Sequence, residues 1–156
     1  MWRHSLLVAL LLVVICPLPT SARRATASKP NGMITKAVQA VLSAQAAAWN
    51  RGDIEGFMAG YWRSEETIFV SGDSLTRGWQ TVLDRYKKNY DTREKMGTLV
   101  YSDLEITPIG TNAAIALGRW HLQRAKDEPH GRFTLIFRRT KQGWRIVHDH
   151  TSSAPA

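Results

Sequence analysis

The 156-residue sequence has little of what small proteins use to cross-link a fold or to hold a cofactor. Its one cysteine, Cys16, lies within the first 22 residues, so the chain beyond them can form no internal disulfide. The sequence contains no Gly-rich phosphate loop, no HExxH-type metal motif and no Ser–His–Asp order. We therefore expect a fold held by an ordinary apolar core, with no cofactor and no metal.

The first 22 residues have the pattern of a cleavable export signal. A short basic head precedes an unbroken apolar run of 11 residues at positions 6–16, whereas a membrane-spanning helix needs about 20. Two prolines follow, and small residues then suit cleavage after Ala22, with Ala27 as a later alternative. The sequence therefore predicts a secreted or periplasmic protein with no stable membrane insertion after signal cleavage. A lipoprotein acylated at Cys16 is disfavoured because no small residue precedes that cysteine.

The remaining chain has the size of one domain and a basic charge. Cleavage after Ala22 leaves 134 residues, enough for a substantial core, and removes one basic residue, Arg3. The 20 basic and 13 acidic side chains that remain give a net charge of +7. The basic residues are scattered, and no cluster, including the one at 138–141, combines with aromatic residues in a nucleic-acid-binding motif. We therefore expect no nucleic-acid partner, only weak attraction to anionic surfaces.

The order of predicted elements indicates an α+β fold. Residues 23–32 have the composition of a flexible lead-in, and residues 33–153 form one domain. From Met33, apolar residues at spacings of three and four predict a helix that ends near Gly52. The predicted elements that follow are a helix at 53–62, strands at 67–70 and 74–77, a helix after Gly78, and strands at 97–109, 113–124, 132–140 and 144–152. Short connections predict antiparallel pairing of the last four strands, with the helices packed on one face.

Several segments carry a resemblance to a known family. Residues 48–53 (AWNRGD), followed by Phe57 and by Tyr and Trp at 61–62, resemble the helix-to-helix corner of SnoaL-like proteins in the nuclear transport factor 2-like superfamily. Arg-Gly at 77–78 fits the same pattern. The closing stretch 143–152 (GWRIVHDHTS) resembles the last strand of that superfamily, and also that of the association domain of calcium/calmodulin-dependent kinases.

The resemblance covers residues 34–153 and implies a fold. That fold is a conical, strongly curved mixed or antiparallel sheet wrapped around three N-terminal helices, with a pocket at its open end and frequent homodimers. The superfamily includes steroid isomerases, polyketide cyclases, hydratases, transport factors and uncharacterised branches, so the resemblance alone sets no activity.

The best-understood enzyme branch, the ketosteroid isomerases, offers a comparison of single positions. That branch uses a tyrosine of the first helix and a carboxylate base at the end of the first short strand, which match Gln45 and Val70 here. Valine cannot accept a proton, and glutamine is a weaker oxyanion donor than a phenol. Steroid-isomerase chemistry is therefore disfavoured, unless a shifted loop brings Asp73 to the base position.

Aromatic, amide and imidazole side chains are the candidate ligand-binding groups. They are Gln45, Trp49, Tyr61, Tyr86, Trp120, His148 and His150. Gln45 interrupts an apolar helix stripe, so its amide needs a partner, either a ligand or a neighbouring strand. The aromatic residues would supply apolar walls with polar tips.

The segment His148-Asp149-His150 is the densest cluster of titratable groups. Regular strand alternation places both histidines on one face with Ile146 and Trp144, and Asp149 on the other. His148 and His150 are therefore the candidate catalytic acid–base groups. Two histidines are too few for zinc, and a third ligand would have to be another histidine, at 121 or 130. Asp149 is expected to form a structural ion pair with an arginine of an adjacent strand, at position 119 or 138.

Three functions remain open from the sequence. The first is an exported SnoaL-like domain that binds a small, partly apolar molecule in its cone. The second is an isomerase-, cyclase- or hydrolase-type enzyme that uses His148 or His150. The third is a non-catalytic homodimeric interaction module whose sheet face is the functional surface.

Overall fold

The computed structural model describes residues 28–155, so the predicted signal at 1–22 and its Cys16 lie outside the described residues. The helices are α1 (Ser28–Asn50), α2 (Ile54–Met58), α3 (Trp79–Asn89) and α4 (Arg93–Met96). The strands are β1 (Ile68–Ser71), β2 (Ser74–Arg77), β3 (Thr98–Ile109), β4 (Ala113–Gln123), β5 (His130–Thr140) and β6 (Gly143–Thr151). Each element predicted from the sequence is present, and α4 is an additional single turn.

The first helix begins earlier than the apolar pattern indicated. Residues 28–32, assigned above to a flexible lead-in, form the first turn of α1. Pro30 is compatible with this position because the N–H that proline lacks would have no helical partner in a first turn. None of the helices within residues 28–155 is long and apolar enough to cross a membrane.

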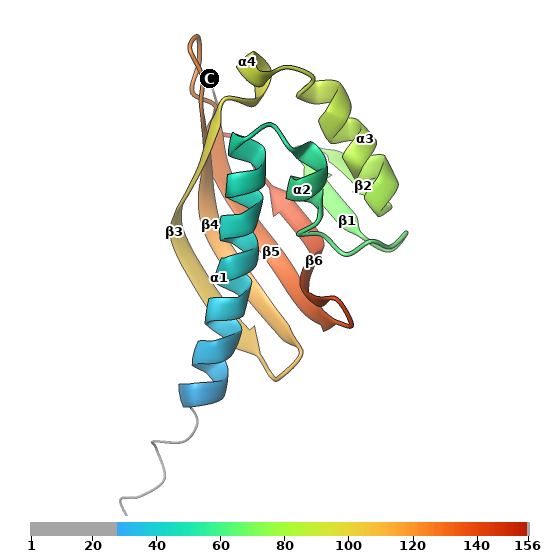
Figure 1. Ribbon diagram of the computed structural model, residues 1–156, viewed down its shortest axis with the longest axis vertical. Helices are drawn as coiled ribbons and strands as arrows, with labels where there is room; N and C mark the ends of the chain where they lie inside the picture. Colours follow the sequence, from blue (N-terminus) through green and yellow to red (C-terminus); the bar gives the residue numbers. More distant parts are fainter. Residues whose placement is uncertain (1–27, 156) are drawn as a thin grey trace, which may run out of the picture.

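Six strands form one open, mixed sheet in the order β2-β1-β6-β5-β4-β3. The four long strands pair antiparallel, as predicted, and β1 runs parallel to β6. Helix α1 lies along the concave face of the long strands, while α2 and α3 cover the part of the sheet near β1 and β6 (Figure 1). The predicted α+β class, with helices packed on one face of a curved sheet, is confirmed.

The corner between α1 and α2 follows from its local sequence. Gly52 adopts a φ of 86°, a left-handed conformation that ends α1. Asp53 then caps α2, because its carboxylate accepts a hydrogen bond from the Gly56 N–H at 2.7 Å. This corner turns the chain back across the concave face, so that Phe57 and Tyr61 pack beneath Trp49 and the rest of the core.

Strand β6 contains one more residue than the segment of β5 opposite it. Ile136 of β5 pairs with His148 of β6, and the next residue of β5, Phe137, pairs with Ile146. Val147 is therefore an extra residue, a β-bulge, and it reverses the side-chain alternation beyond it. Ile146 faces the core on one side of the bulge, and Asp149 faces the core on the other.

Candidate functional site

A cavity of about 130 Å³ lies between the concave face of the sheet and the helices. Much of its wall is aromatic. The rings that line it include Trp49, Phe57, Phe69, Tyr90, Trp120 and Phe133. Asn89 and Ser153 are the exposed members of the lining and mark its opening to solvent. Large rings with little mobility are suited to hold the apolar part of a small molecule.

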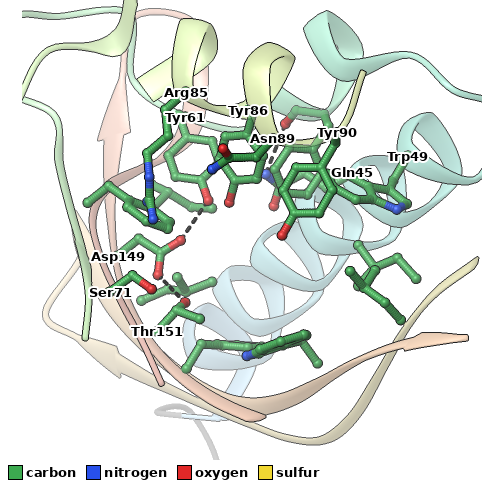
Figure 2. Close-up of a pocket in the computed structure, with 18 of the residues that line it drawn as sticks. Gln45, Trp49, Tyr61, Ser71, Arg85, Tyr86, Asn89, Tyr90, Asp149 and Thr151 are labelled. Atoms are coloured by element: carbon green, nitrogen blue, oxygen red, sulfur yellow. Dashed lines mark hydrogen bonds between the residues drawn. The ribbon is translucent and has the colours of Figure 1, made fainter. Parts of the chain in front are cut away.

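One end of the cavity is polar and is organised around a buried carboxyl group. Asp149, 3% exposed, accepts a hydrogen bond at Oδ2 from the Tyr61 hydroxyl at 2.6 Å. Its Oδ1 accepts a second from the Thr151 hydroxyl, also at 2.6 Å. Figure 2 shows Asp149 and Thr151 reaching in from the sheet, while Tyr61 and Tyr86 point in from the helical side.

The environment of Asp149 shifts its acidity toward neutral pH. Burial raises the pKa of this carboxyl from 3.8 to about 6, because a charge is poorly solvated inside the fold. The hydrogen bonds from Thr151 and Tyr61 and the charges of His150 and Arg85 oppose that rise. A carboxyl group with this pKa can accept or release a proton near neutral pH.

Three tyrosines near Asp149 remain protonated hydrogen-bond donors over the physiological range. Burial raises the pKa of Tyr61, Tyr86 and Tyr101 well above the usual value for a phenol, and the nearby Asp149 charge raises it further. Tyr61 directs its proton to Asp149. The cavity therefore offers phenolic donors beside a titratable carboxyl.

Arg85 supplies the positive charge of the cavity. Its side chain, half-buried on α3, lines the cavity, and its guanidinium carbon lies 4.7 Å above the centre of the Phe69 ring. It is the one basic residue of the lining, and Asp149 is the one acidic residue. When Asp149 is ionised, the two charges of the lining balance.

Five of the predicted ligand-binding residues line this cavity: Gln45, Trp49, Tyr61, Tyr86 and Trp120. Each of the two tryptophans donates its indole N–H to a main-chain carbonyl, so these N–H groups are already bonded and the apolar part of each ring is left to line the cavity. Gln45, whose partner was left open above, donates from Nε2 to the Phe57 carbonyl of α2 at 2.9 Å, and not to a strand. Ligand binding by these residues remains a prediction.

The predicted orientation of the β6 histidines is wrong. His148 pairs with Ile136 and His150 with Thr134, on the outer face of the sheet, and neither lines the cavity. The bulge at Val147 is the cause, because it breaks the regular alternation on which the prediction depended. All four histidines within residues 28–155 lie on that outer face. No group of three potential metal ligands occurs in the same residues.

The predicted ion pair of Asp149 is also wrong. Asp149 faces inward and bonds to hydroxyl groups, whereas Arg119 lies 3.5 Å from Asp103 on the outside. The inward position of the Asp149 carboxylate also changes the comparison with the isomerase branch, because the cavity does contain a carboxylate, although not at the matched base position. Val70, the matched base position, pairs with His150 on the outer face, so the carboxyl of the cavity comes from the last strand.

Several residues that line the cavity were not predicted from the sequence as site residues: Asp149, Thr151, Arg85 and Tyr101. A bulge leaves no clear mark in a single sequence, so the inward position of Asp149 had no signal. Thr151 had none either, because residues two apart on a strand share a face and its inward position follows only from that of Asp149.

The fold and this cavity define the class of protein as a nuclear transport factor 2-like α+β domain. The chain belongs to the SnoaL-like domain family, whose model matches residues 38–156. None of the functionally curated proteins compared with the chain matches it.

Solved structures agree with this assignment. A nuclear transport factor 2-like protein of unknown function from Shewanella oneidensis is 40% identical, with a TM-score of 0.74, over 77% of this chain and 99% of that one. A nuclear transport factor 2-like superfamily protein from Salmonella enterica serovar Typhimurium is 22% identical, with a TM-score of 0.64, over 80% of this chain and 94% of that one. A ketosteroid isomerase-like protein from Erwinia carotovora is 17% identical, with a TM-score of 0.62, over 78% and 96%. The last two similarities concern the fold alone.

Proposed function

We propose that the protein is exported through removal of residues 1–22 and that the domain at 33–153 binds a small, partly apolar molecule in the cavity. The observation that carries this proposal is the asymmetry of the cavity wall, with a buried carboxyl at one end and aromatic rings around the rest. A ligand with a flat apolar body and one polar end matches such a wall. The rings would bury its apolar area, and the carboxyl group would orient it.

The charges of the lining support an uncharged ligand. Asp149 and Arg85 already balance one another, so a charged molecule would lose its hydration without gaining an uncompensated counter-charge. Hydroxyl, carbonyl and amide groups can exchange hydrogen bonds with Asp149 and with the phenol of Tyr86 or Tyr101. A neutral ring compound with one such group is therefore the expected ligand class.

The experiment is ligand capture followed by mass spectrometry on protein recovered from the exporting cell. Ser71 is half-buried in the lining, so Ser71→Trp should fill the cavity and abolish co-purification of the compound. Ser102→Trp is the matched control, since Ser102 is exposed on β3 outside the lining, and it should retain the compound. Recovery of the same compound on Ser71→Trp, or of none on the wild type, would refute binding in this cavity.

Export has a separate readout in the mass of the recovered protein. Cleavage after Ala22 gives a chain that begins at Arg23, and the later alternative gives one that begins at Ser28. An intact N-terminus on protein from outside the cell would contradict signal removal.

A second candidate function is isomerase-type proton transfer within the same cavity. The observation that favours it is Asp149, whose pKa of about 6 suits a general base at neutral pH. The role that the sequence suggested for His148 or His150 passes to this carboxyl, because the histidines lie on the other face. In this proposal Asp149 takes a proton from a carbon acid, and a neighbouring phenol donates a hydrogen bond to the oxygen that gains charge.

We also propose a homodimer, formed through the outer face of the sheet. Val100, Leu117 and Ile136, on three neighbouring strands, are 40%, 42% and 36% exposed on that face. A second copy would cover these apolar side chains, which otherwise lie in water. The non-catalytic interaction module considered above depends on the same face.

A further inference from the structure

A second hollow, of about 380 Å³, lies at the end of the sheet where β5 turns into β6. We refer to it as the basic groove. It shares no lining residue with the aromatic cavity. Four basic residues line it, Arg63, Arg138, Arg139 and Lys141, and no acidic one does. The groove therefore concentrates positive charge in a concave surface.

Main-chain bonds hold one wall of the basic groove in place. The Trp62 N–H donates to the Ile146 carbonyl at 2.8 Å, which attaches this segment along the start of β6. The neighbouring Arg63 guanidinium lies 4.5 Å above the centre of the Trp79 ring. Arg63 is an exposed residue whose guanidinium stacks on a ring and whose neighbour in the chain is anchored to β6.

One arginine of the basic groove lies beside a like charge outside its lining, and the charges of the groove have no acidic partner. Arg138 and Arg145 are directly opposite on neighbouring antiparallel strands, a like-charge pair that destabilises a sheet. Among the described residues, no carboxylate forms an ion pair with Arg63, Arg138, Arg139, Lys141 or Arg145.

An adjoining hollow supplies no unpaired carboxylate to balance these positive charges. It shares Arg63 with the basic groove and adds Arg145, Lys87 and one acidic residue, Glu55. Glu55 already forms an ion pair with Lys87 at 2.7 Å, so its charge is balanced by that lysine. An anion from outside the chain is the species that would relieve the repulsion across both hollows.

We propose that the basic groove is a binding site for a phosphate group, distinct from the aromatic cavity and its ligand. Guanidinium groups bind phosphate oxygens through two parallel hydrogen bonds, and three arginines line this groove. The phosphate belongs either to a soluble phosphorylated compound or to a lipid headgroup. Asp149 takes no part in this site, so phosphate binding can be tested separately from ligand binding in the aromatic cavity.

The first arm of the test uses inorganic pyrophosphate and the purified full chain in isothermal titration calorimetry. The double variant Arg138→Gln/Arg139→Gln removes two exposed charges of the groove and should weaken binding at least about tenfold. The control, Lys36→Gln/Lys88→Gln, removes two exposed charges outside both hollows and should change the affinity less than twofold. Thermal unfolding of each variant confirms that it is folded.

The second arm uses sedimentation with vesicles of phosphatidylglycerol in phosphatidylcholine, compared with phosphatidylcholine alone. Binding to the anionic vesicles but not to pyrophosphate, lost in the arginine variant only, assigns the phosphate to a headgroup and supports the site. Binding to pyrophosphate that is lost in the same selective way assigns it to a soluble compound. No binding in either arm, or equal weakening by the lysine control, overturns the proposal, since the interaction would then follow net charge alone.

Discussion

The Tyr61 hydroxyl donates to Asp149 Oδ2 at 2.6 Å, across a sequence separation of 88 residues. The bond joins the segment after α2 to the last strand, where the main chain of Tyr61 also forms a parallel bridge with Ile146. Backbone and side chain therefore position the same two segments. Their junction defines the polar end of the cavity.

The stability of the protein should fall with rising pH because of Asp149. Its folded pKa of about 6 exceeds the unfolded value of 3.8, so the folded state binds more protons between these values. The contribution is fully present below about pH 4 and is lost as pH rises through about 6. At 1.36 kcal/mol per pKa unit, it amounts to about 3 kcal/mol.

Urea unfolding of the wild type and of Asp149→Asn at several pH values checks this expectation. Other groups titrate in both proteins, so the quantity to follow is the difference between their free energies of unfolding. The wild type should gain about 2 kcal/mol relative to the variant between pH 7 and pH 4, since the unfolded carboxyl is only partly protonated at pH 4. A pH-independent difference would show that Asp149 titrates normally.

Tyr61→Phe should destabilise the fold and make Asp149 a weaker acid. The variant preserves the ring but removes the donor to a carboxylate, a bond that typically contributes about 1.5–3 kcal/mol. That bond also lowers the pKa of Asp149, so its loss should move the pKa upward. To measure the shift, the free energy of unfolding of Tyr61→Phe is compared at each pH with that of Tyr61→Phe/Asp149→Asn. The pH at which this difference changes should be higher than in the wild-type background. An unchanged pH profile would contradict the assigned role of the phenol.

Ligand binding or turnover should depend on Asp149 and not on the neighbouring histidines. Asp149→Asn should lower the affinity or rate at least about tenfold, because it replaces the buried carboxyl of the cavity. His148→Gln and His150→Ala should retain wild-type values, since both side chains lie on the outer face. The reverse pattern, with loss in a histidine variant alone, would return the acid–base role to the histidines.

Gly60→Ala should destabilise the protein through Gln45. A Cβ at position 60 would lie 2.5 Å from Gln45 Cδ, and Gln45 is 2% exposed with little room to move. Overpacking of this kind costs about 1–3 kcal/mol. In a double-mutant cycle, Gly60→Ala should cost much less in a Gln45→Ala background, measured by denaturant unfolding. Additive effects would indicate that the strain lies elsewhere.

The homodimer should be disrupted by a charge in the centre of the outer sheet face. Light scattering on the wild type should give twice the chain mass, and Leu117→Arg should give the monomer. Met33→Arg, at a 67% exposed apolar position on α1, is the control and should remain dimeric. A wild type that is monomeric at high concentration would exclude this interface.

Much of the fold could be predicted because its signals are local. The helix that ends at Gly52 and the cap at Asp53 depend on a few adjacent residues. The parallel pairing of β1 with β6 was not predicted, because the paired residues, such as Ile68 and His148, are 80 positions apart. The aromatic side of the cavity was predicted from Trp49 and Tyr61 in the family-like corner, whereas its buried carboxyl was not.

By itself, the sequence determined the class of fold, the order of its elements and the family, because hydrophobic periodicity, turn residues and short motifs act over a few positions. Its export signal is likewise a local pattern and stays a prediction. Only the tertiary structure decided which face of β6 meets the cavity. One unpaired residue, Val147, sets that choice through the register with β5, turning Asp149 inward and both histidines outward. The basic groove arises in the same way, since packing brings Arg63 beside the β5–β6 turn.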